Sequence, residues 1–211
     1  MDKLYIKIIK GKHMKAMKLS ILFFLMNVGF LIAQDAKKGE LSIGVGDGTS
    51  TRIVYALSES FSGLFSGTND VTTTSSGAFH ASYKFGLSER FMFGAIFITE
   101  KIDSESIEQP ENRFLESTTA RTTTFAVEAD FRFVKTEYWQ MYSGLGLGYT
   151  SAKEDTERAT NTGIISDEKK GSNFNGHLNV FSVRYGKSFG VFAGAGFGYK
   201  GILNAGLSFQ F

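Results

Sequence analysis

The chain contains no cysteine and a single proline among its 211 residues. Without cysteine, neither a disulfide scaffold nor a metal site built on thiolates can form. Charged residues make up only 21% of the chain, against 42% hydrophobic and 14% aromatic residues. This composition excludes a disordered, solvated polymer. The chain therefore folds, and its length is that of one domain.

The amino terminus has the composition of a secretory signal peptide. Six lysines precede an uncharged run of 16 residues from Leu19 to Gln34, which is the order of charge and apolarity in such a signal. The run is shorter than the ~20 residues that a spanning helix needs, although an uncleaved anchor helix is the alternative. We predict a cleaved signal peptide over residues 1–33, with cleavage beside Ala33 or Gln34. Met14 and Met17 are alternative initiators.

The positive charge of the chain belongs to this leader. Removing residues 1–33 takes away six lysines and one aspartate, which leaves 17 basic and 20 acidic residues and changes the formal charge from +2 to −3. Nucleic-acid binding requires a clustered positive face, so we expect no nucleic-acid partner. No cysteine follows the apolar run, which excludes a bacterial lipoprotein anchor.

Beyond residue 34 the dominant pattern is an alternation of apolar residues with small or polar ones. Between Phe125 and Phe133 the odd positions are apolar, and the even positions include Glu128 and Arg132. A period of two predicts a strand with one apolar face. In Asn175–Tyr185 the alternation holds only from Phe181 onward, so a bulge is expected there. We predict eight strands, around Leu41–Val45, Phe79–Leu87, Phe91–Phe97, Phe125–Phe133, Trp139–Tyr149, Asn175–Tyr185, Phe189–Tyr199 and Leu203–Phe211.

The connections between these strands alternate in length. Tight turns are expected at Leu87–Arg90, Lys135–Glu137 and Lys187–Ser188, whereas the segments 47–76, 102–119 and 153–173 are long. Only Lys200–Gly201 is short on the long-loop side. Short turns at one end and long loops at the other are typical of an up-and-down transmembrane barrel.

The alternating faces separate a membrane barrel from a soluble sandwich or lipocalin-like barrel, which remains the alternative fold. The polar face is rich in glycine, which suits a narrow lumen better than an outer surface. The apolar face ends in aromatic rings at both ends, as expected at two membrane interfaces. We assign two girdles, Phe85, Phe91, Phe133, Trp139, Tyr185, Phe189 and Phe211 at the short-turn end, and Phe79, Phe97, Phe125, Tyr149, Phe197 and Tyr199 at the long-loop end.

Over residues 39–211 this pattern resembles the small bacterial outer-membrane barrels of the OmpA/OmpX type. The carboxy-terminal alternation is similar to the assembly signal of that family, and its members would be Leu203, Ala205, Leu207, Phe209 and Phe211. The resemblance implies passage across the periplasm with chaperones, insertion by the barrel-assembly machinery, and a Gram-negative-type outer membrane with its lipid and lipopolysaccharide as surroundings. Residues 34–38 would then be a short periplasmic segment before an outer-membrane β-barrel.

Two of the long loops have patterns of their own. In the first, Ile53, Leu57, Phe61 and Leu64 have helical spacing after the cap candidates Thr49, Ser50 and Thr51, and Gly67 would stop the helix. We favour a short helix that caps the barrel mouth over a ligand lid or an outer-leaflet contact. The second loop is acidic, and we favour a solvated surface over a divalent-cation site. Its charged residues are Asp103, Glu105, Glu108, Glu111 and Glu116 against Arg113.

The polar face carries charges that would point into the lumen. They are Lys84, Glu128, Asp130, Arg132 and Arg184. Buried ions need partners, so we expect mutual pairing and a lumen plugged by side chains. An eight-stranded barrel leaves room for little more than side chains. A thin polar path between glycines is the alternative.

The sequence contains few residues that could form a catalytic site. His80 and Ser82 share the inward face, and outer-membrane lipid A deacylases and palmitoyltransferases use a His and a Ser on eight-stranded barrels. Activation needs a nucleophile and a base in hydrogen-bond contact with an orienting carboxylate, which this spacing does not supply. We therefore predict no catalytic, cofactor or metal site. The predicted function is surface structure, adhesion or recognition, with a narrow passive channel or a lipid A-modifying enzyme as alternatives.

Overall fold

The computed structural model describes residues 39–57, 69–108, 113–160 and 163–211, without the side chains of 69–71, 107–108 and 113–115. Several predictions concern residues outside the described ranges: the signal peptide, the segment 34–38, Phe61, Leu64, the helix stop at Gly67, and Glu111. The strands are β1 (Gly39–Asp47), β2 (Asn69–Ser75), β3 (Ala78–Gly86), β4 (Phe91–Glu108), β5 (Arg113–Lys135), β6 (Trp139–Thr160), β7 (Gly163–Gly186), β8 (Phe189–Gly198) and β9 (Leu203–Gln210).

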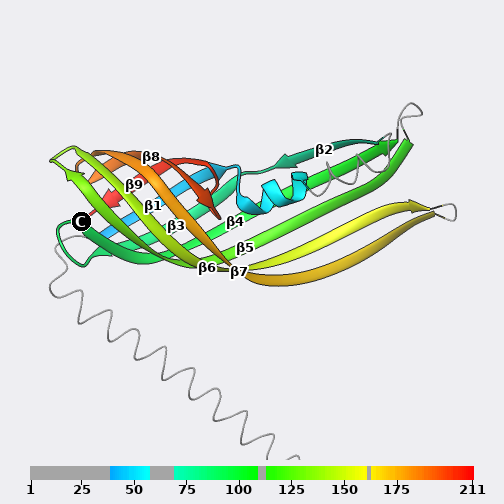
Figure 1. The fold of residues 1–211 in the computed structure, drawn as a ribbon, viewed down its shortest axis with the longest axis horizontal. Helices are drawn as coiled ribbons and strands as arrows, with labels where there is room; N and C mark the ends of the chain where they lie inside the picture. Colours follow the sequence, from blue (N-terminus) through cyan, green and yellow to red (C-terminus); the bar gives the residue numbers. More distant parts are fainter. Residues whose placement is uncertain (1–38, 58–68, 109–112, 161–162) are drawn as a thin grey trace, which may run out of the picture. The chain divides into compact units, whose positions relative to one another are not determined.

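Eight of these strands form a closed antiparallel ring (Figure 1). The ring follows the chain from β1 through β3 to β9, and β9 pairs with β1 to close it. At the closure, Gly39 and Phe211 exchange backbone hydrogen bonds of 2.8 and 3.0 Å. β2 is not a member of the ring and pairs with the far part of β4. The predicted fold class, an eight-stranded antiparallel up-and-down barrel, is confirmed.

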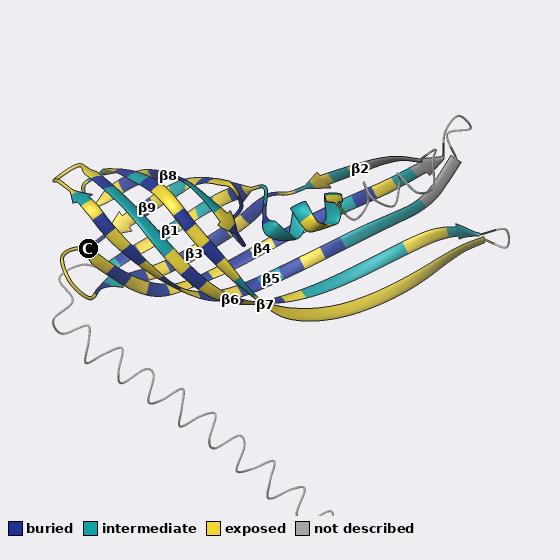
Figure 2. Cartoon of the chain, in the orientation of Figure 1, coloured by how far each residue is buried: buried dark blue, intermediate teal, exposed yellow. Residues whose placement is uncertain are grey.

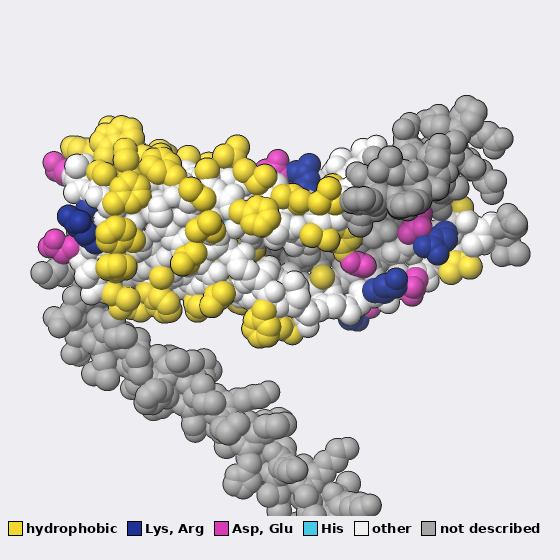
Figure 3. Space-filling model, in the orientation of Figure 1, with side chains coloured by type: hydrophobic (Ala, Val, Ile, Leu, Met, Phe, Trp, Pro, Cys, Tyr) yellow, Lys and Arg dark blue, Asp and Glu magenta, His cyan; other side chains and the backbone are white. Residues whose placement is uncertain are grey.

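The barrel is apolar outside and polar inside, the reverse of a soluble barrel. On β5, Phe125 and Val127 are 64% and 48% exposed, whereas Ala126 and Glu128 are 6% and 2% exposed. Burial alternates in this way along the ring strands (Figure 2). In Figure 3 hydrophobic side chains are spread over the barrel surface, and the charged ones lie near its two ends. The prediction of which face is apolar is therefore correct.

The apolar band has the height of an outer-membrane core. Trp139 and Tyr149 mark its two ends on β6 and are ten residues apart, about 33 Å along a strand. At a tilt of about 40° this spans about 25 Å, the usual height of the lipid-facing band. Aromatic pairs lie at both ends, with ring centroids 4.7 Å apart for Trp139–Tyr185 and 4.9 Å for Phe97–Phe125.

One residue of the predicted girdles is assigned to the wrong face. Tyr199 is 3% exposed and points into the lumen, because β8 ends at Gly198 and the strand alternation stops there. Gly198 and Gly201 have φ values of +134° and +95°, a region that favours glycine. The β8–β9 turn can therefore bend so that Tyr199 and Lys200 are both buried.

The segments expected to be long loops are largely strand. β4 continues to Glu108 and β5 begins at Arg113, so the predicted loop 102–119 is mostly a hairpin. β6 and β7 pair from Thr160 and Gly163 inward, so the predicted loop 153–173 is a second hairpin. Beyond the ring, β2 and the far parts of β4, β5, β6 and β7 form what we call the projecting sheet (Figure 1).

Two local predictions are confirmed. The register shifts between Asn179 and Phe181, where Val180 and Phe181 both face outward, which is the expected bulge. Residues 50–57 are helical where a helix is expected, and Thr49 caps them because its Oγ1 accepts the Arg52 N–H at 3.1 Å. Thr49 also donates to Glu100 of β4 at 2.7 Å. No helix in the described ranges is long and apolar enough to cross a membrane.

Candidate functional site: the lumen and the projecting sheet

The lumen contains a cluster of charges around Glu128, which we call the central cluster (Lys84, Glu128, Asp130, Tyr199 and Lys200). Lys84 Nζ lies 2.8 Å from Glu128 and 2.5 Å from Asp130. Lys200 Nζ lies 2.9 Å from Glu128, and the Tyr199 hydroxyl donates to the same carboxylate at 3.0 Å. Two lysines and two carboxylates balance, so the cluster is neutral overall.

A second cluster lies toward the short turns, which we call the turn-end cluster (Glu40, Arg132, Gln140, Arg184 and Gln210). Arg132 Nη2 donates to Glu40 at 2.8 Å, and Gln210 also donates to this carboxylate. Gln140 and Gln210 exchange hydrogen bonds of 3.0 and 3.1 Å. Arg184 donates to Ser208 at 2.7 Å and to the carbonyls of the β7–β8 turn, and lies 3.8 Å from Glu40.

Several of these contacts cross the interior. β5 and β1 are separated by β3 and β4 along the ring, yet Arg132 of β5 reaches Glu40 of β1. Glu128 of β5 meets Lys200 of the β8–β9 turn. Glycine makes room for this packing, since a Cβ at Gly146 would lie 1.8 Å from the Tyr199 hydroxyl oxygen. Side chains therefore bridge the lumen at two levels.

All five charges predicted to face the lumen are buried there, but their pairing differs in part from the expectation. Lys84 pairs with Glu128 and Asp130, whereas Arg132 and Arg184 lie beside Glu40 instead. Glu40 and Lys200 were missed, because Glu40 precedes the recognised alternation and Lys200 sits in a turn. Glu40 lies two residues before Ser42 on the same face of β1, so extending the alternation of this strand toward the amino terminus could have identified it.

The geometry of His80 and Ser82 does not form a nucleophile and base pair. The Ser82 hydroxyl is 2.7 Å from that of Ser42. Neither nitrogen of His80 has a hydrogen-bond partner among the described atoms, and the same is true of His177. In the part of the chain that the structure describes, no three His, Asp or Glu side chains lie close enough to hold a metal ion.

The projecting sheet has an open edge along β7. β7 pairs with β8 only from His177 onward, so residues 163–176 bond to β6 on one side and to no described strand on the other. Every residue from Gly163 to Phe174 is exposed. Apolar side chains lie on this edge as well, since Ile164, Ile165 and Phe174 are 66%, 58% and 84% exposed.

Described residues of the expected acidic loop lie on strands, where two of the acids form ion pairs, one within β4 and one between β5 and β6. Asp103 lies 2.7 Å from Lys101 and accepts a hydrogen bond from Thr119, and these bonds lower the pKa of its carboxyl. Glu116 lies 2.9 Å from Arg158. These acids therefore occupy strand positions and not a loop, but their side chains and those of their basic partners remain solvent-accessible, as expected of a solvated surface.

Comparison with known proteins adds two solved structures. No family model and no curated protein matches the chain. The chain is similar to Ail, the attachment invasion locus protein of Yersinia pestis, in complex with the heparin analogue sucrose octasulfate, at 13% identity and a TM-score of 0.40 over 82% of this chain and 99% of that one. A second Ail crystal structure gives 14% identity and a TM-score of 0.36 over the same shares. The fold assignment rests on the strand ring itself.

Proposed function

We propose that this chain is an integral outer-membrane protein that holds an adhesive or recognition sheet outside the cell. The observation that carries the proposal is the open edge of β7, displayed on strands that continue directly from the barrel wall. An exposed strand edge presents unpaired backbone N–H and C=O groups and is a template for an added strand. The partner would therefore be an extended segment of another protein.

The barrel serves as the anchor in this proposal. Its outward apolar band of about 25 Å fits the outer-membrane core, and residues 1–33 would direct export. The short turns would face the periplasm and the projecting sheet the outside. The outward residues of β9, among them Phe209 and Phe211, are proposed to be read by the assembly machinery, and outer-membrane lipid and lipopolysaccharide would surround the band.

The adhesion proposal predicts that the barrel without its β6–β7 projection loses attachment. Thr150 and Asn173 are cross-strand partners, so a two-residue Asn-Gly turn between them can replace residues 151–172 and close the hairpin. Cells displaying the shortened protein should attach to immobilised host-surface proteins no better than cells without it. The matched control replaces Lys187–Ser188 at the other end with Asn-Gly. Equal attachment by the shortened and complete proteins would refute the role of this edge.

A narrow passive channel is the second candidate, because the lumen contains buried polar atoms that lack protein partners. They include both nitrogens of His80 and His177 and Asn175 Oδ1, and buried polar groups are usually satisfied by protein or by water. The side chains bridging the lumen at two levels favour the plug. The unfolding free energy and the bilayer conductance of a Glu128→Gln variant separate the two possibilities.

A further inference from the structure

The outward face of strands β4 to β7 carries side chains in bands that run across the strands. Phe97, Phe125, Tyr149 and Phe174 are successive cross-strand partners and form an aromatic band. Two residues from the aromatic band on each strand, toward the projecting sheet, lies a hydroxyl band formed by Thr99, Thr123, Ser151 and Ser172. Another two residues on lies a basic band, formed by Lys101, Arg121, Lys153 and Lys170. Cross-strand partners share a face, so each band is continuous.

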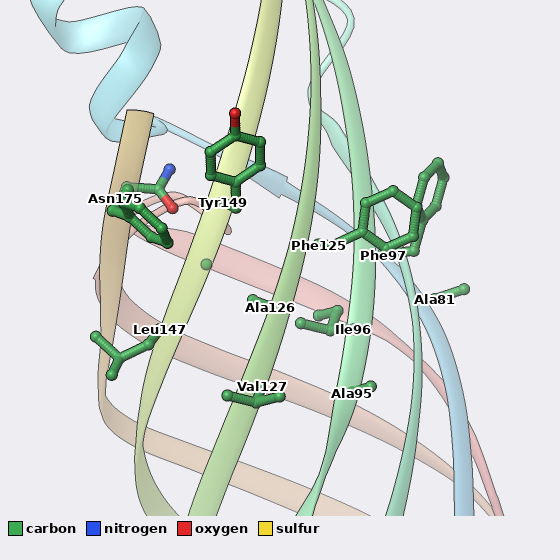
Figure 4. A pocket seen from close by; sticks show the side chains of 12 residues that line it. Ala81, Ala95, Ile96, Phe97, Phe125, Ala126, Val127, Leu147, Tyr149 and Asn175 are labelled. Carbon is green, nitrogen blue, oxygen red and sulfur yellow. The ribbon is translucent and has the colours of Figure 1, made fainter. Parts of the chain in front are cut away.

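An apolar groove of about 710 Å³ begins at the aromatic band and runs along the barrel wall (Figure 4). Its sides include the Phe97–Phe125 pair and the Tyr149–Phe174 pair, whose centroids are 4.9 and 5.2 Å apart. Small outward side chains such as Ala81 and Ala95 also line it. A groove lined by rings and small side chains has the shape and polarity for acyl chains.

The bands lie at the heights where a lipid changes from chain to headgroup. The hydroxyl and basic bands are two and four residues beyond the rings, about 5 and 10 Å farther along the membrane normal at a tilt of about 40°. The headgroup region of a leaflet is about 5 to 8 Å thick, so the hydroxyl band lies within it and the basic band lies just beyond its outer edge, within reach of a long side chain. Hydroxyl, ammonium and guanidinium donors at this height complement phosphate.

Arg121 is the member of the basic band that is free to bind such a group. Lys101 pairs with Asp103, and Lys153 and Lys170 pair with Glu168, all on the side away from the membrane. On β5 the position beyond Arg121 is Thr119. Asp103 on the neighbouring strand is near enough that Arg121 helps to lower its pKa, but no described residue forms an ion pair with Arg121. A second exterior groove, lined by Ile43, Phe79 and Leu207 among others, touches the bands only at Phe97 and Thr99 of β4. On its other side β1 ends at Asp47 and β9 begins at Leu203, so the bands do not continue there.

We propose that this face binds a phosphorylated outer-leaflet lipid, with acyl chains in the groove and a headgroup phosphate held by Arg121 and the hydroxyl band. The inference rests on the membrane placement proposed above. It goes beyond that placement because it assigns one side of the barrel to one lipid chemistry. The lipid would sit below the projecting sheet and not around the whole barrel.

The test measures lipid retention by native mass spectrometry of the folded protein, purified from outer membranes into neutral detergent. The probes are diphosphoryl lipid A and the same lipid with its phosphates removed. The wild-type protein should retain the phosphorylated lipid about fivefold better, and Arg121→Gln should abolish that preference. Arg90→Gln, an equal change at the exposed β3–β4 turn, should leave it intact.

A second pair of variants tests the groove. Ala95→Trp fills it from the outward face and should lower retention of both lipids severalfold, whereas Ala193→Trp, outward on β8, should not. Equal retention of the two lipids by the wild-type protein, or an unchanged preference in Arg121→Gln, would overturn the inference. Displacement of the lipid by millimolar inorganic phosphate would also overturn it, since the site would then hold phosphate and not a lipid. Failure of the protein to reach the outer membrane would instead refute the proposed function.

Discussion

Replacing Glu128 with glutamine is expected to destabilise the barrel by about 3–5 kcal/mol, the usual cost of removing one partner from a buried ion pair. Glu128 is 2% exposed and lies within 3 Å of both Lys84 and Lys200. The glutamine keeps the volume but leaves the central cluster with two lysines and one carboxylate. The free energy of unfolding, measured by urea titration in lipid vesicles, reports the loss.

A control variant and a double variant test whether the loss comes from the unbalanced charge in the central cluster. Glu105→Gln on the exposed part of β4 should change the unfolding free energy little. Adding Lys200→Met to Glu128→Gln should recover part of the loss, because the cluster is neutral again. If the lumen is a water-filled path, the loss falls to about 1 kcal/mol or less and bilayer conductance changes. A small loss with altered current would therefore favour the channel over the plug.

The second large effect is expected on the outer surface. Ala129 faces outward midway between Phe125 and Phe133 on β5, so Ala129→Arg places a charge near the middle of the apolar band. Such a change costs about 2–4 kcal/mol in a membrane barrel. The same unfolding measurement in vesicles reports the loss.

The control for Ala129→Arg lies on the same strand and the same face. Ser117 is outside the apolar band and is the cross-strand partner of Glu105 and Glu157. Ser117→Arg should therefore have little effect on the unfolding free energy. Equal effects of the two arginines would show that Ala129 does not face lipid.

The ring strands could be predicted from sequence because their two faces meet different surroundings. On β5 the contrast between Phe125, Val127 and Phe131 outside and Glu128 and Asp130 inside produces a clear period of two. The same contrast revealed the bulge at Val180, where two successive residues face outward. The inward direction of all five predicted lumen charges follows from the same period.

The projecting sheet could not be predicted in the same way. Beyond the apolar band both faces of β6 and β7 are solvent-accessible, so segments such as Glu154–Arg158 and Asp167–Lys170 carry charge on both faces and lose the period. Their strand structure depends on cross-strand partners such as Thr118 and Thr156, whose hydroxyls are 3.2 Å apart. The inward bend of Tyr199 and Lys200 depends on the turn glycines and on Glu128 of a distant strand.

The most direct test of membrane placement uses the absence of cysteine, since single cysteines can be introduced cleanly. Spin labels at the outward positions 117, 119, 121, 123, 125, 127, 129, 131 and 133 of β5 can be compared for collisions with oxygen, which partitions into lipid, and with a water-soluble nickel chelate. If the barrel spans the membrane as proposed, collisions should be nickel-dominated from 117 to 121 and oxygen-dominated from 125 to 133, with the crossover at Thr123. Nickel access at 127, 129 and 131 equal to that at 117 would contradict this placement.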